Sequence, residues 1–178
     1  MEFKQLMLTR QSTRAYAADK AVEPEKLQAV LEAGRLAPSA SNGQPWHAYV
    51  AGGETAKSWL PFMTNDKGAN RFLNDVPVLI ALTHDGEGKV VDVNGVQCIL
   101  DYRTFDVGGM CAYMTLRASD LGLGTCIIGY MDAQAFGKHL NLPEGEVVDI
   151  VIALGYPAEN DPIRDKKRKE FDEVVKYL

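Results

Sequence analysis

Residues 101–130 read DYRTFDVGGMCAYMTLRASDLGLGTCIIGY, and this stretch decides which fold we expect. Its apolar spacing predicts a long helix over about residues 101–121, with a surface made small in part by Gly108 and Gly109. Each glycine costs roughly 1 kcal/mol of helix propensity, so adjacent glycines favour the close approach of another helix or of a flat ligand. A glycine turn then leads into an apolar run at 125–130, which is typical of a strand. We therefore expect a central packing helix that returns directly into a sheet.

The rest of the chain alternates helix and strand patterns around this stretch. Helices are predicted near Phe3–Met7, from Pro24 to the region of Gly34–Pro38, over 54–63, from an Asp132 cap to Leu140 and from Glu170, and strands over 46–51, 76–83 and 147–154. The run at 76–83 is continuously apolar, which indicates a strand buried on both faces. About four strands among helices predict an α+β or α/β sheet sandwich, in one domain over residues 1–178.

Composition narrows the class of protein. The chain has 178 residues, of which 46% are apolar and 24% charged, and these values are typical of a folded globular domain. Its longest uncharged apolar stretch is far too short to span a bilayer, and its first residues lack the pattern of a signal peptide. Cys98, Cys111 and Cys126 have apolar neighbours and form no Cys-x-x-Cys pair, which argues against a disulfide framework or a cysteine metal site. We expect a cytoplasmic protein with no membrane partner, and we expect Cys111 and Cys126 in its core.

The formal net charge of −5 hides one basic segment. Residues 164–169 carry +4, so the remainder of the chain carries −9. A mainly acidic surface repels a phosphate backbone, which predicts no nucleic-acid partner and favours a small anion instead. Taken alone, the basic segment has a simpler interpretation, because a run of charges is normally a solvated face.

The first candidate site is the RQSTR motif at Arg10–Arg14. Two guanidinium groups flank two hydroxyls directly after a short helix, and binding a phosphate monoester takes several cations plus a hydroxyl or a backbone N–H. Arg10, Ser12 and Arg14 supply such a set. An ordinary polar turn after a helix explains the same residues equally well.

The second candidate site is the loop APSASNGQPW at Ala37–Trp46. Its two serines and its Asn and Gln offer alternating hydrogen-bond donors and acceptors, which suit the edge of a heteroaromatic ring. A surface loop whose polar residues only satisfy turns is the alternative. Trp46 directly after the loop favours an anchored segment over a mobile one.

The third candidate site is GLGTCIIG at Gly122–Gly129, a glycine turn before an apolar strand. Gly129 is explained by the close approach of a ligand to the backbone or, more commonly, by a turn at the end of a strand. The chain contains no Gly-rich dinucleotide fingerprint, P-loop, zinc-type His pair or nucleophile elbow. These absences argue against a nucleotide cofactor in a Rossmann crevice.

Read jointly and in order, these segments resemble the nitroreductase family of flavin mononucleotide (FMN) enzymes. The matching segments are Arg10–Arg14, Ala37–Trp46, Asp106 with the small-residue helix, Leu121–Gly129, Ala153–Pro157 and the Lys-x-Arg at Lys166–Arg168. Six matches in register span nearly the whole chain and make a specific signal. The resemblance implies an α+β three-layer sandwich, in which helices flank a mostly antiparallel sheet around a long central helix. It also implies an intertwined homodimer with two flavins at the subunit interface.

The resemblance gives roles to the residues that match the family's motifs. Arg10, Ser12, Lys166 and Arg168 would hold the FMN phosphate. Arg14 would lie near N1 and the C2 carbonyl of the ring, where a fixed cation raises the reduction potential of the flavin. The phosphate role explains the basic segment better than a solvated face does.

Other matching positions would contact the ribityl chain and the ring. Ser39, Ser41 and Asn42 would come from the other subunit, with Pro38 against the ring, while backbone groups at the end of the third candidate site would lie beside N5. The complete expected set of cofactor-binding residues is Arg10, Gln11, Ser12, Arg14, Pro38, Ser39, Ala40, Ser41, Asn42, Gln44, Ile127, Ile128, Gly129, Lys166 and Arg168. Some family members have an acidic residue where this chain has Ile128, but the contact expected at N5 uses the backbone N–H. No metal is expected, and no residue is nominated as catalytic, because such proteins contribute stacking, orientation and charge.

The implied activity is a ping-pong oxidoreduction. NADH or NADPH gives hydride to flavin N5 and leaves, and a nitroaromatic, quinone or similar conjugated acceptor takes its place. Larger family members cover the site with an insertion for which this chain has little room, so the acceptor stays open, as does the choice between NADH and NADPH. One alternative is a specialised flavin reaction, such as dehalogenation, enone reduction or flavin fragmentation. A remote alternative is a non-catalytic anion-binding or interaction module whose basic tail docks a partner.

The histidines and three of the tyrosines receive structural interpretations. The three histidines are His47, His84 and His139. Their spacing is not that of metal ligands, so we expect them at the surface or at strand edges. Tyr102, Tyr113 and Tyr130 are candidates for a substrate pocket, although aromatic core packing is the commoner explanation.

Overall fold

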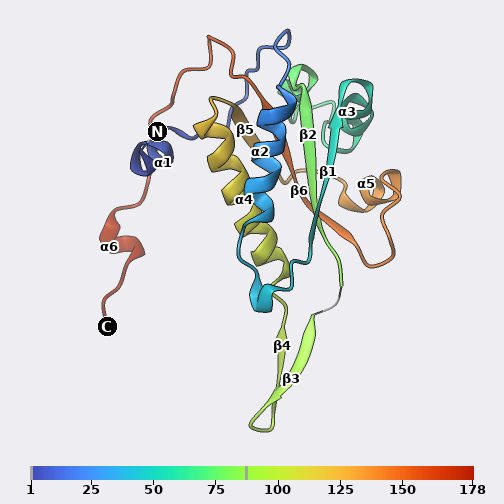
Figure 1. Ribbon diagram of the computed structural model, residues 1–178, viewed down its shortest axis with the longest axis vertical. Helices are drawn as coiled ribbons and strands as arrows, with labels where there is room; N and C mark the ends of the chain where they lie inside the picture. Colours follow the sequence, from blue (N-terminus) through green and yellow to red (C-terminus); the bar gives the residue numbers. More distant parts are fainter. Residues whose placement is uncertain (1, 87) are drawn as a thin grey trace.

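The computed structural model describes residues 2–86 and 88–178, and a four-stranded antiparallel sheet lies at its centre (Figure 1). The strands follow the order β1, β2, β6 and β5, which are Trp46–Gly52, Val78–His84, Val147–Gly155 and Gly124–Ile128. β2 is an inner strand, and its residues from Leu79 to His84 are all buried. The prediction of a strand buried on both faces is confirmed.

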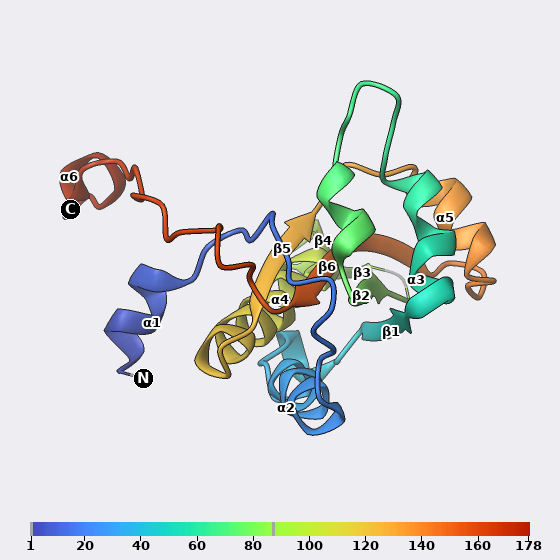
Figure 2. The same cartoon turned by 90° about the horizontal axis from the view of Figure 1, so that it is seen from above.

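Helices cover both faces of the sheet. α2 (Pro24–Arg35) and the long α4 (Arg103–Asp120) lie on one face, and α3 (Gly53–Trp59) and α5 (Ala133–His139) lie on the other (Figure 2). Successive side chains of a strand point to opposite faces, so β2 sends Leu79 and Ala81 to the α3–α5 layer and Ile80 and Leu82 to the α2–α4 layer. The result is the predicted α+β three-layer sandwich with an antiparallel sheet and a long helix against it.

Local signals account for the position of several helices. Pro24 occupies a first-turn position of α2, where the missing N–H costs no helical hydrogen bond. The Asp132 side chain accepts a hydrogen bond from Ala135 N at 3.0 Å and caps α5, as predicted. Gly34 lets α2 approach α4 closely, because a Cβ at this position would collide with the Met114 side chain.

A β-hairpin that we did not predict separates β2 from α4. β3 (Lys89–Val93) and β4 (Val96–Leu100) pair antiparallel and stand away from the sandwich (Figure 1). Asn94 and Gly95 form the turn, with φ angles of 55° and 81°. An Asn-Gly pair between two apolar runs is a strong hairpin signal, so the local sequence contained the necessary information.

Other elements are shorter than predicted. The helix expected over 54–63 ends at Trp59 and is followed by a 3-10 turn, η2 (Leu60–Phe62), because Pro61 has no N–H to continue the α-helical ladder. The C-terminal helix α6 (Phe171–Val174) is a single turn. Two further 3-10 turns are η1 (Ala40–Asn42), within the second candidate site, and η3 (Arg71–Asp75).

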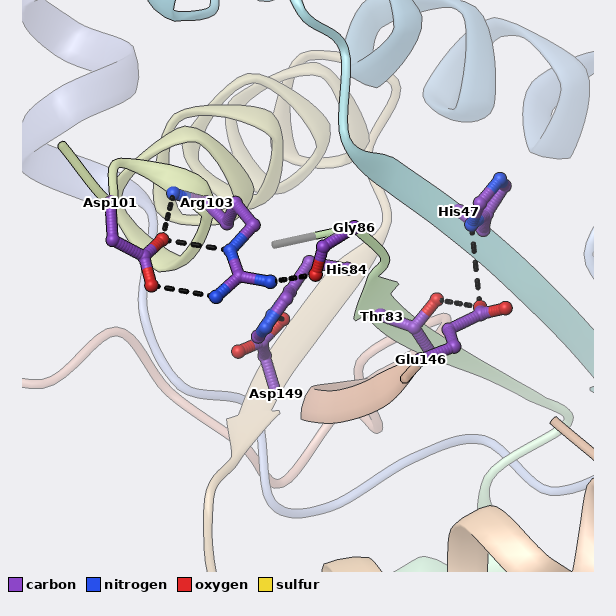
Figure 3. Close-up of polar contacts among 8 residues, drawn as sticks. All are labelled: His47, Thr83, His84, Gly86, Asp101, Arg103, Glu146 and Asp149. Carbon is purple, nitrogen blue, oxygen red and sulfur yellow. Dashed lines mark hydrogen bonds and ion pairs between the residues drawn. The ribbon is translucent and has the colours of Figure 1, made fainter. Parts of the chain in front are cut away.

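Polar contacts fix the root of the hairpin to α4, and a neighbouring pair joins β2 to β6 (Figure 3). Arg103 donates to Asp101 at 2.8 and 2.7 Å and also to the Gly86 carbonyl, so one side chain joins both ends of the hairpin. The Arg103 guanidinium lowers the pKa of Asp101 to about 2. Close by, His84 Nδ1 lies 2.7 Å from Asp149 Oδ2. His84 is buried, contrary to the expected surface or strand-edge position, and the carboxylate supplies the partner that a buried imidazole needs.

Both ends of the chain lie on the same side of the sandwich (Figures 1 and 2). α1 (Phe3–Thr9) borders α4 and buries Leu6, whereas α6 projects from the body. They carry apolar side chains that are largely exposed in a single chain, including Phe3 at 63% and Phe171 at 62%. Across residues 2–86 and 88–178, no helix is both long enough and apolar enough to cross a membrane.

Candidate cofactor site

Ser12 and Thr13 lie against the outer edge of β5, and residues 15–17 pair with residues 156–158, just after β6. Thr13 N donates to Thr125 O at 2.8 Å, and Ser12 forms an isolated parallel bridge with Thr125. Gly124 is required for this contact, because a Cβ there would collide with the Thr13 side chain. The RQSTR motif is thereby fixed beside the edge strand of the sheet.

The C-terminal segment returns to the same place. Gln11 Nε2 donates to Pro162 O at 3.1 Å, and the backbone N–H of Arg164 donates to Gln11 Oε1 at 2.9 Å. The Arg164 guanidinium donates to Ser12 O and pairs with Asp161, both at 2.5 Å. These contacts bring the basic segment to the RQSTR motif, although the two are separated by most of the chain.

Lys166 ends in a buried charge without a counter-ion. Its Nζ atom has no hydrogen-bond partner among the described residues, while the rest of the side chain is partly exposed. Burial lowers the pKa of Lys166, and repulsion from Arg10, Arg168 and Arg164 lowers it further. A buried ammonium among other cations is unfavourable unless an anion joins them. A phosphate group, with a charge of about −1.5 to −2 and several acceptor oxygens, fits this cluster.

Cys126 lies in β5 beside the same cluster. Burial raises the pKa of its thiol, while Arg14 and a hydrogen bond with Ser12 act in the opposite direction. Burial also raises the pKa of Cys111 to about 11. Both cysteines are buried and free, so the prediction of core residues is confirmed, whereas the side chain of Cys98 lies outside the described residues.

Beyond Thr13, the outer edge of β5 offers backbone groups to a ligand. Backbone groups two residues apart on a strand point the same way, so those of Ile127 face the edge to which Thr125 O points. The Ile128 side chain is buried in the α3–α5 core, and by the same alternation its backbone groups point toward β6. A Cβ on Gly129 would meet nothing within 4 Å. The end of this strand therefore leaves open space in which a planar ring can approach the backbone.

The loop of residues 38–44 is anchored at the other end of α4. The buried Asp106 carboxylate accepts the Ala40 N–H at 3.1 and 3.2 Å, and Ser39 Oγ accepts the Gln44 N–H at 3.0 Å. Positive φ angles between 47° and 54° occur at three of its residues: Ser41, Asn42 and Gln44. Such angles cost energy in residues other than glycine, and a strained loop held by a buried carboxylate is typical of a functional site.

One chain does not bring the two halves of the predicted site together. Asp106, near the start of α4, holds the loop, whereas Ser119 and Gly122, near its end, line a hollow of about 260 Å³ together with Arg10. A helix rises about 1.5 Å per residue, so roughly 20 Å of α4 lies between the two halves. Figure 1 shows the same separation, with the teal turn of η1 below the lower end of α4 and β5 beginning near its upper end.

Sequence reasoning missed the residues that position these segments. Arg164 belonged to the basic segment, but its contacts with Asp161 and with the distant Ser12 O, which fix the C-terminal return, were not predicted. Asp106 belonged to a matching segment, whereas its contact with Ala40 was not predicted. Within the part of the chain that the structure describes, no group of three or more His, Cys, Asp or Glu residues could hold a metal ion.

Comparison with known sequences gives matches along most of the chain. The model of the Nitroreductase family matches residues 7–64 and 54–156. A protein of Methanothermobacter thermautotrophicus, provisionally named NADH dehydrogenase/NAD(P)H nitroreductase, is 29% identical over 93% of this chain and 82% of its own. An iodotyrosine deiodinase of Haliscomenobacter hydrossis is 25% identical over 98% of this chain and 87% of its own.

Solved structures show the same fold over almost the full length. A nitroreductase family protein from Clostridium difficile 630 is 26% identical, covers 99% of this chain and 98% of its own, and superposes with a TM-score of 0.81. An FMN-dependent nitroreductase from Clostridium difficile R20291 is 27% identical, covers 97% of this chain and 96% of its own, and gives a TM-score of 0.74. The expected fold class is confirmed.

Proposed function

Because this chain belongs to the nitroreductase family and is an NAD(P)H-dependent FMN oxidoreductase, we propose that it reduces nitroaromatic, quinone or similar conjugated acceptors in a ping-pong sequence. The observation that carries the proposal is the buried, unpaired ammonium of Lys166 among three arginines. A cofactor that ends in a phosphate supplies the anion that this cluster lacks.

The phosphate would be held where the two basic segments meet. Arg10, Ser12, Lys166 and Arg168 provide the cations and the hydroxyl. Arg164 is already committed to Ser12 O and Asp161, so it positions the segment instead of binding the ligand. Phosphate entry gives Lys166 Nζ a partner and offsets the like-charge repulsion within the cluster.

Bound FMN supplies the redox chemistry, since its N5 atom accepts hydride from a nicotinamide and passes it to an acceptor. The chain would orient the ring along the open edge of β5, with the Gly129 N–H, in the peptide that follows Ile128, beside N5 and with Gln11 and Ile127 along the cofactor. Arg14 would place a fixed positive charge near N1 and the C2 carbonyl. A fixed cation there stabilises the negative charge that reduction creates and so favours the reduced state.

A second copy of the chain would complete each site. The loop of residues 38–44 lies roughly 20 Å of helix away from the phosphate cluster, so it would contact the flavin held by the partner. Its contact residues would be Pro38, Ser39, Ala40, Ser41, Asn42 and Gln44. Cover from a partner also suits the exposed apolar side chains of α1 and α6. The functional unit would be a homodimer with a small-molecule electron acceptor as its other partner.

Titration with FMN tests the proposal. Wild-type protein should bind FMN, and NADH or NADPH should bleach the bound flavin in the absence of oxygen. Arg10→Ala should weaken FMN binding by roughly 1.5–3 kcal/mol, which is typical of a lost hydrogen bond to a charged group. Arg35→Ala is the matched control, because Arg35 pairs with Glu32 on the surface of α2. Purified protein that takes up no FMN would contradict the proposal. Anion binding that requires residues 164–169 but not Arg10 would instead favour the non-catalytic anion-binding module.

Reductive dehalogenation is a second candidate function, and the deiodinase relative that matches 98% of this chain favours it. In that reaction two electrons and a proton replace a C–I bond by a C–H bond and release iodide. The test compares turnover of 3-iodotyrosine with turnover of a nitroaromatic panel on fully FMN-loaded protein. Iodide release with negligible nitroreduction would favour the second candidate over the first.

A further inference from the structure

Tyr130 directly follows Gly129, whose N–H would lie beside flavin N5 under the proposed function. Its side chain is 58% exposed, and those of Tyr102 and Tyr113 are 48% and 46% exposed, so the expectation of aromatic core packing is wrong for all three. Consecutive Cα atoms lie about 3.8 Å apart, so the Tyr130 side chain starts beside any ring that contacts the Gly129 backbone. An exposed tyrosine at this position offers a hydroxyl to a ligand.

The Tyr130 hydroxyl is held by the side chain of Asn65. Asn65 Nδ2 lies 2.7 Å from the phenolic oxygen, and Asn65 Oδ1 accepts the backbone N–H of Ala69 at 3.1 Å. A backbone N–H can only donate, so the Ala69 contact fixes which end of the amide is the oxygen. The amide nitrogen therefore faces Tyr130, and because it too can only donate, the phenolic oxygen is the acceptor in this contact.

The hydrogen of the Tyr130 hydroxyl must consequently point away from Asn65. A hydroxyl has a single hydrogen to donate, and the amide nitrogen of Asn65 cannot accept it. Within residues 2–86 and 88–178, Asn65 is the hydrogen-bond partner of this hydroxyl and no second one is present. A hydroxyl that is held at its oxygen and open at its hydrogen suits a ligand that presents an acceptor oxygen.

Backbone contacts hold both sides of this pair in place. Asp132 N donates to Phe62 O at 2.9 Å, which joins the segment after β5 to η2. Asn70 Nδ2 donates to Met63 O at 2.9 Å and closes the loop that carries Asn65. A donor that is ordered before the ligand arrives requires little reorganisation when the ligand binds or reacts.

Reduction of a conjugated carbonyl or nitro group creates negative charge on an oxygen atom. The hydride forms a new bond at the acceptor and displaces an electron pair toward that oxygen, and solvent water then supplies the proton. A fixed hydrogen-bond donor at the oxygen stabilises the charge as it develops. The nicotinamide develops the opposite charge, because it becomes a cation when it loses hydride, so the same donor gives no such benefit to flavin reduction.

We propose that Tyr130 is a catalytic residue of acceptor reduction, in which its hydroxyl donates a hydrogen bond to the carbonyl or nitro oxygen on which charge develops. Asn65 is a positioning residue, because it acts through the direction that it gives to the Tyr130 hydrogen. The inference rests on the proposed function, which puts the flavin ring at Gly129. Tyr130 then favours acceptors whose conjugated system ends in an oxygen over acceptors that have none.

Infrared spectroscopy of bound acetophenone tests this contact without turnover, since oxidised FMN-loaded protein transfers no hydride when nicotinamide is left out. A hydrogen bond to a carbonyl oxygen lowers the C=O stretching frequency, so this frequency should be lower in the wild-type complex than in Tyr130→Phe. The Kd of acetophenone should rise about 2- to 12-fold in Tyr130→Phe, as expected for one lost hydrogen bond. Tyr113→Phe is the matched control, because it removes the hydroxyl of another exposed tyrosine, on α4, and it should behave like wild type.

Asn65→Asp separates the direction of the hydrogen from the presence of the phenol. The carboxylate keeps an acceptor for the Ala69 N–H but replaces the amide nitrogen by a second acceptor. Tyr130 should then donate its hydrogen to this carboxylate, and bound acetophenone should show the same raised C=O frequency as in Tyr130→Phe. FMN affinity should match wild type in all three variants, which checks that each of them is folded.

Turnover gives a second readout. The kcat/KM for 1,4-naphthoquinone should fall roughly 100-fold in Tyr130→Phe, which is the lower value typical of a lost oxyanion donor. The kcat/KM for ferricyanide, which contains no oxygen, should stay unchanged, as should the rate of flavin reduction at saturating nicotinamide.

The possible results separate the inference from the proposed function. Equal C=O frequencies in wild type and Tyr130→Phe would overturn the inference, and so would FMN-loaded wild-type protein that binds no acetophenone. A wild-type C=O frequency in Asn65→Asp would overturn the orienting role of Asn65. Wild-type protein that takes up no FMN would instead contradict the proposed function, and this result precedes any use of acetophenone.

Discussion

At the scale of single residues, the charge of Lys166 is unfavourable in the FMN-free protein and would be favourable when FMN is bound. Its buried Nζ has no hydrogen-bond partner among residues 2–86 and 88–178, and neighbouring arginines repel its charge. Lys166→Met keeps the aliphatic stem and removes the charge, so we expect FMN binding to weaken by roughly 1.5–3 kcal/mol, or about 10- to 150-fold. The melting temperature of the FMN-free protein should not fall, because the lost charge made no hydrogen bond. Lys167→Met is the control, because Lys167 is exposed, and equal FMN affinity in the two variants would contradict the phosphate assignment.

The lowered pKa of Lys166 also predicts a pH dependence of FMN binding. In the free protein this lysine loses its proton below its usual value of 10.5, whereas a bound phosphate raises the pKa again. The complex therefore holds more protons than the free protein as pH rises through the lowered pKa toward 10.5, and FMN affinity must fall across this window. In the same window the unfolded chain holds more protons than the FMN-free fold, so the stability of that fold should rise with pH. FMN titrations across this pH window check the predicted fall in FMN affinity. If FMN affinity falls equally steeply with pH in Lys166→Met, another group causes the fall.

At the scale of elements, Gly124 in β5 and Gly129 just after β5 should respond differently to replacement by alanine. A Cβ on Gly124 would collide with Thr13, whereas a Cβ on Gly129 would meet open space. Gly124→Ala should lower the free energy of unfolding of the FMN-free protein by roughly 1–3 kcal/mol, as overpacking does. Gly129→Ala should leave that free energy unchanged and weaken FMN binding, because the methyl group would enter the space that we assign to the ring. Urea denaturation and FMN titration measure the two effects, and a Gly129→Ala protein with normal FMN affinity would place the ring elsewhere.

Elements that depend on local signals could be predicted from the sequence. The apolar run of β2 and the Asp132 cap of α5 are examples, because both are decided by neighbours in the chain. The hairpin around Asn94 and Gly95 was missed although its turn signal is local.

The parts of the candidate site that could not be predicted depend on distant contacts. The left-handed backbone of Ser41 exists in a loop held by Asp106, which lies in another helix. The hydrogen bond from Arg164 to Ser12 O joins residues 152 positions apart in the chain, and no sequence pattern predicts such a contact.

At the scale of the whole molecule, α4 separates the two halves of the proposed site, which one chain does not bring together. The phosphate cluster around Arg10 lies near the end of this helix, and the loop held by Asp106 lies near its start. A twofold-symmetric dimer would solve this geometry, because each chain would then give its cluster to one site and its loop to the other. The exposed apolar arms, α1 and α6, have the right character to hold such a dimer together.

Mixed dimers test this arrangement directly. One variant loses the phosphate half through Arg10→Ala with Lys166→Met, and the other loses the loop half through Ser39→Ala with Asn42→Ala. Each variant alone has two damaged sites and should bind FMN weakly. In a mixed dimer, the loop variant's intact phosphate cluster meets the phosphate variant's intact loop, which restores one site of the two. Equal co-expression makes about half of the dimers mixed, so about a quarter of the wild-type FMN sites should return. FMN content after gel filtration measures this fraction, and a co-expressed protein with no more flavin than its parents would show that each chain builds its site alone.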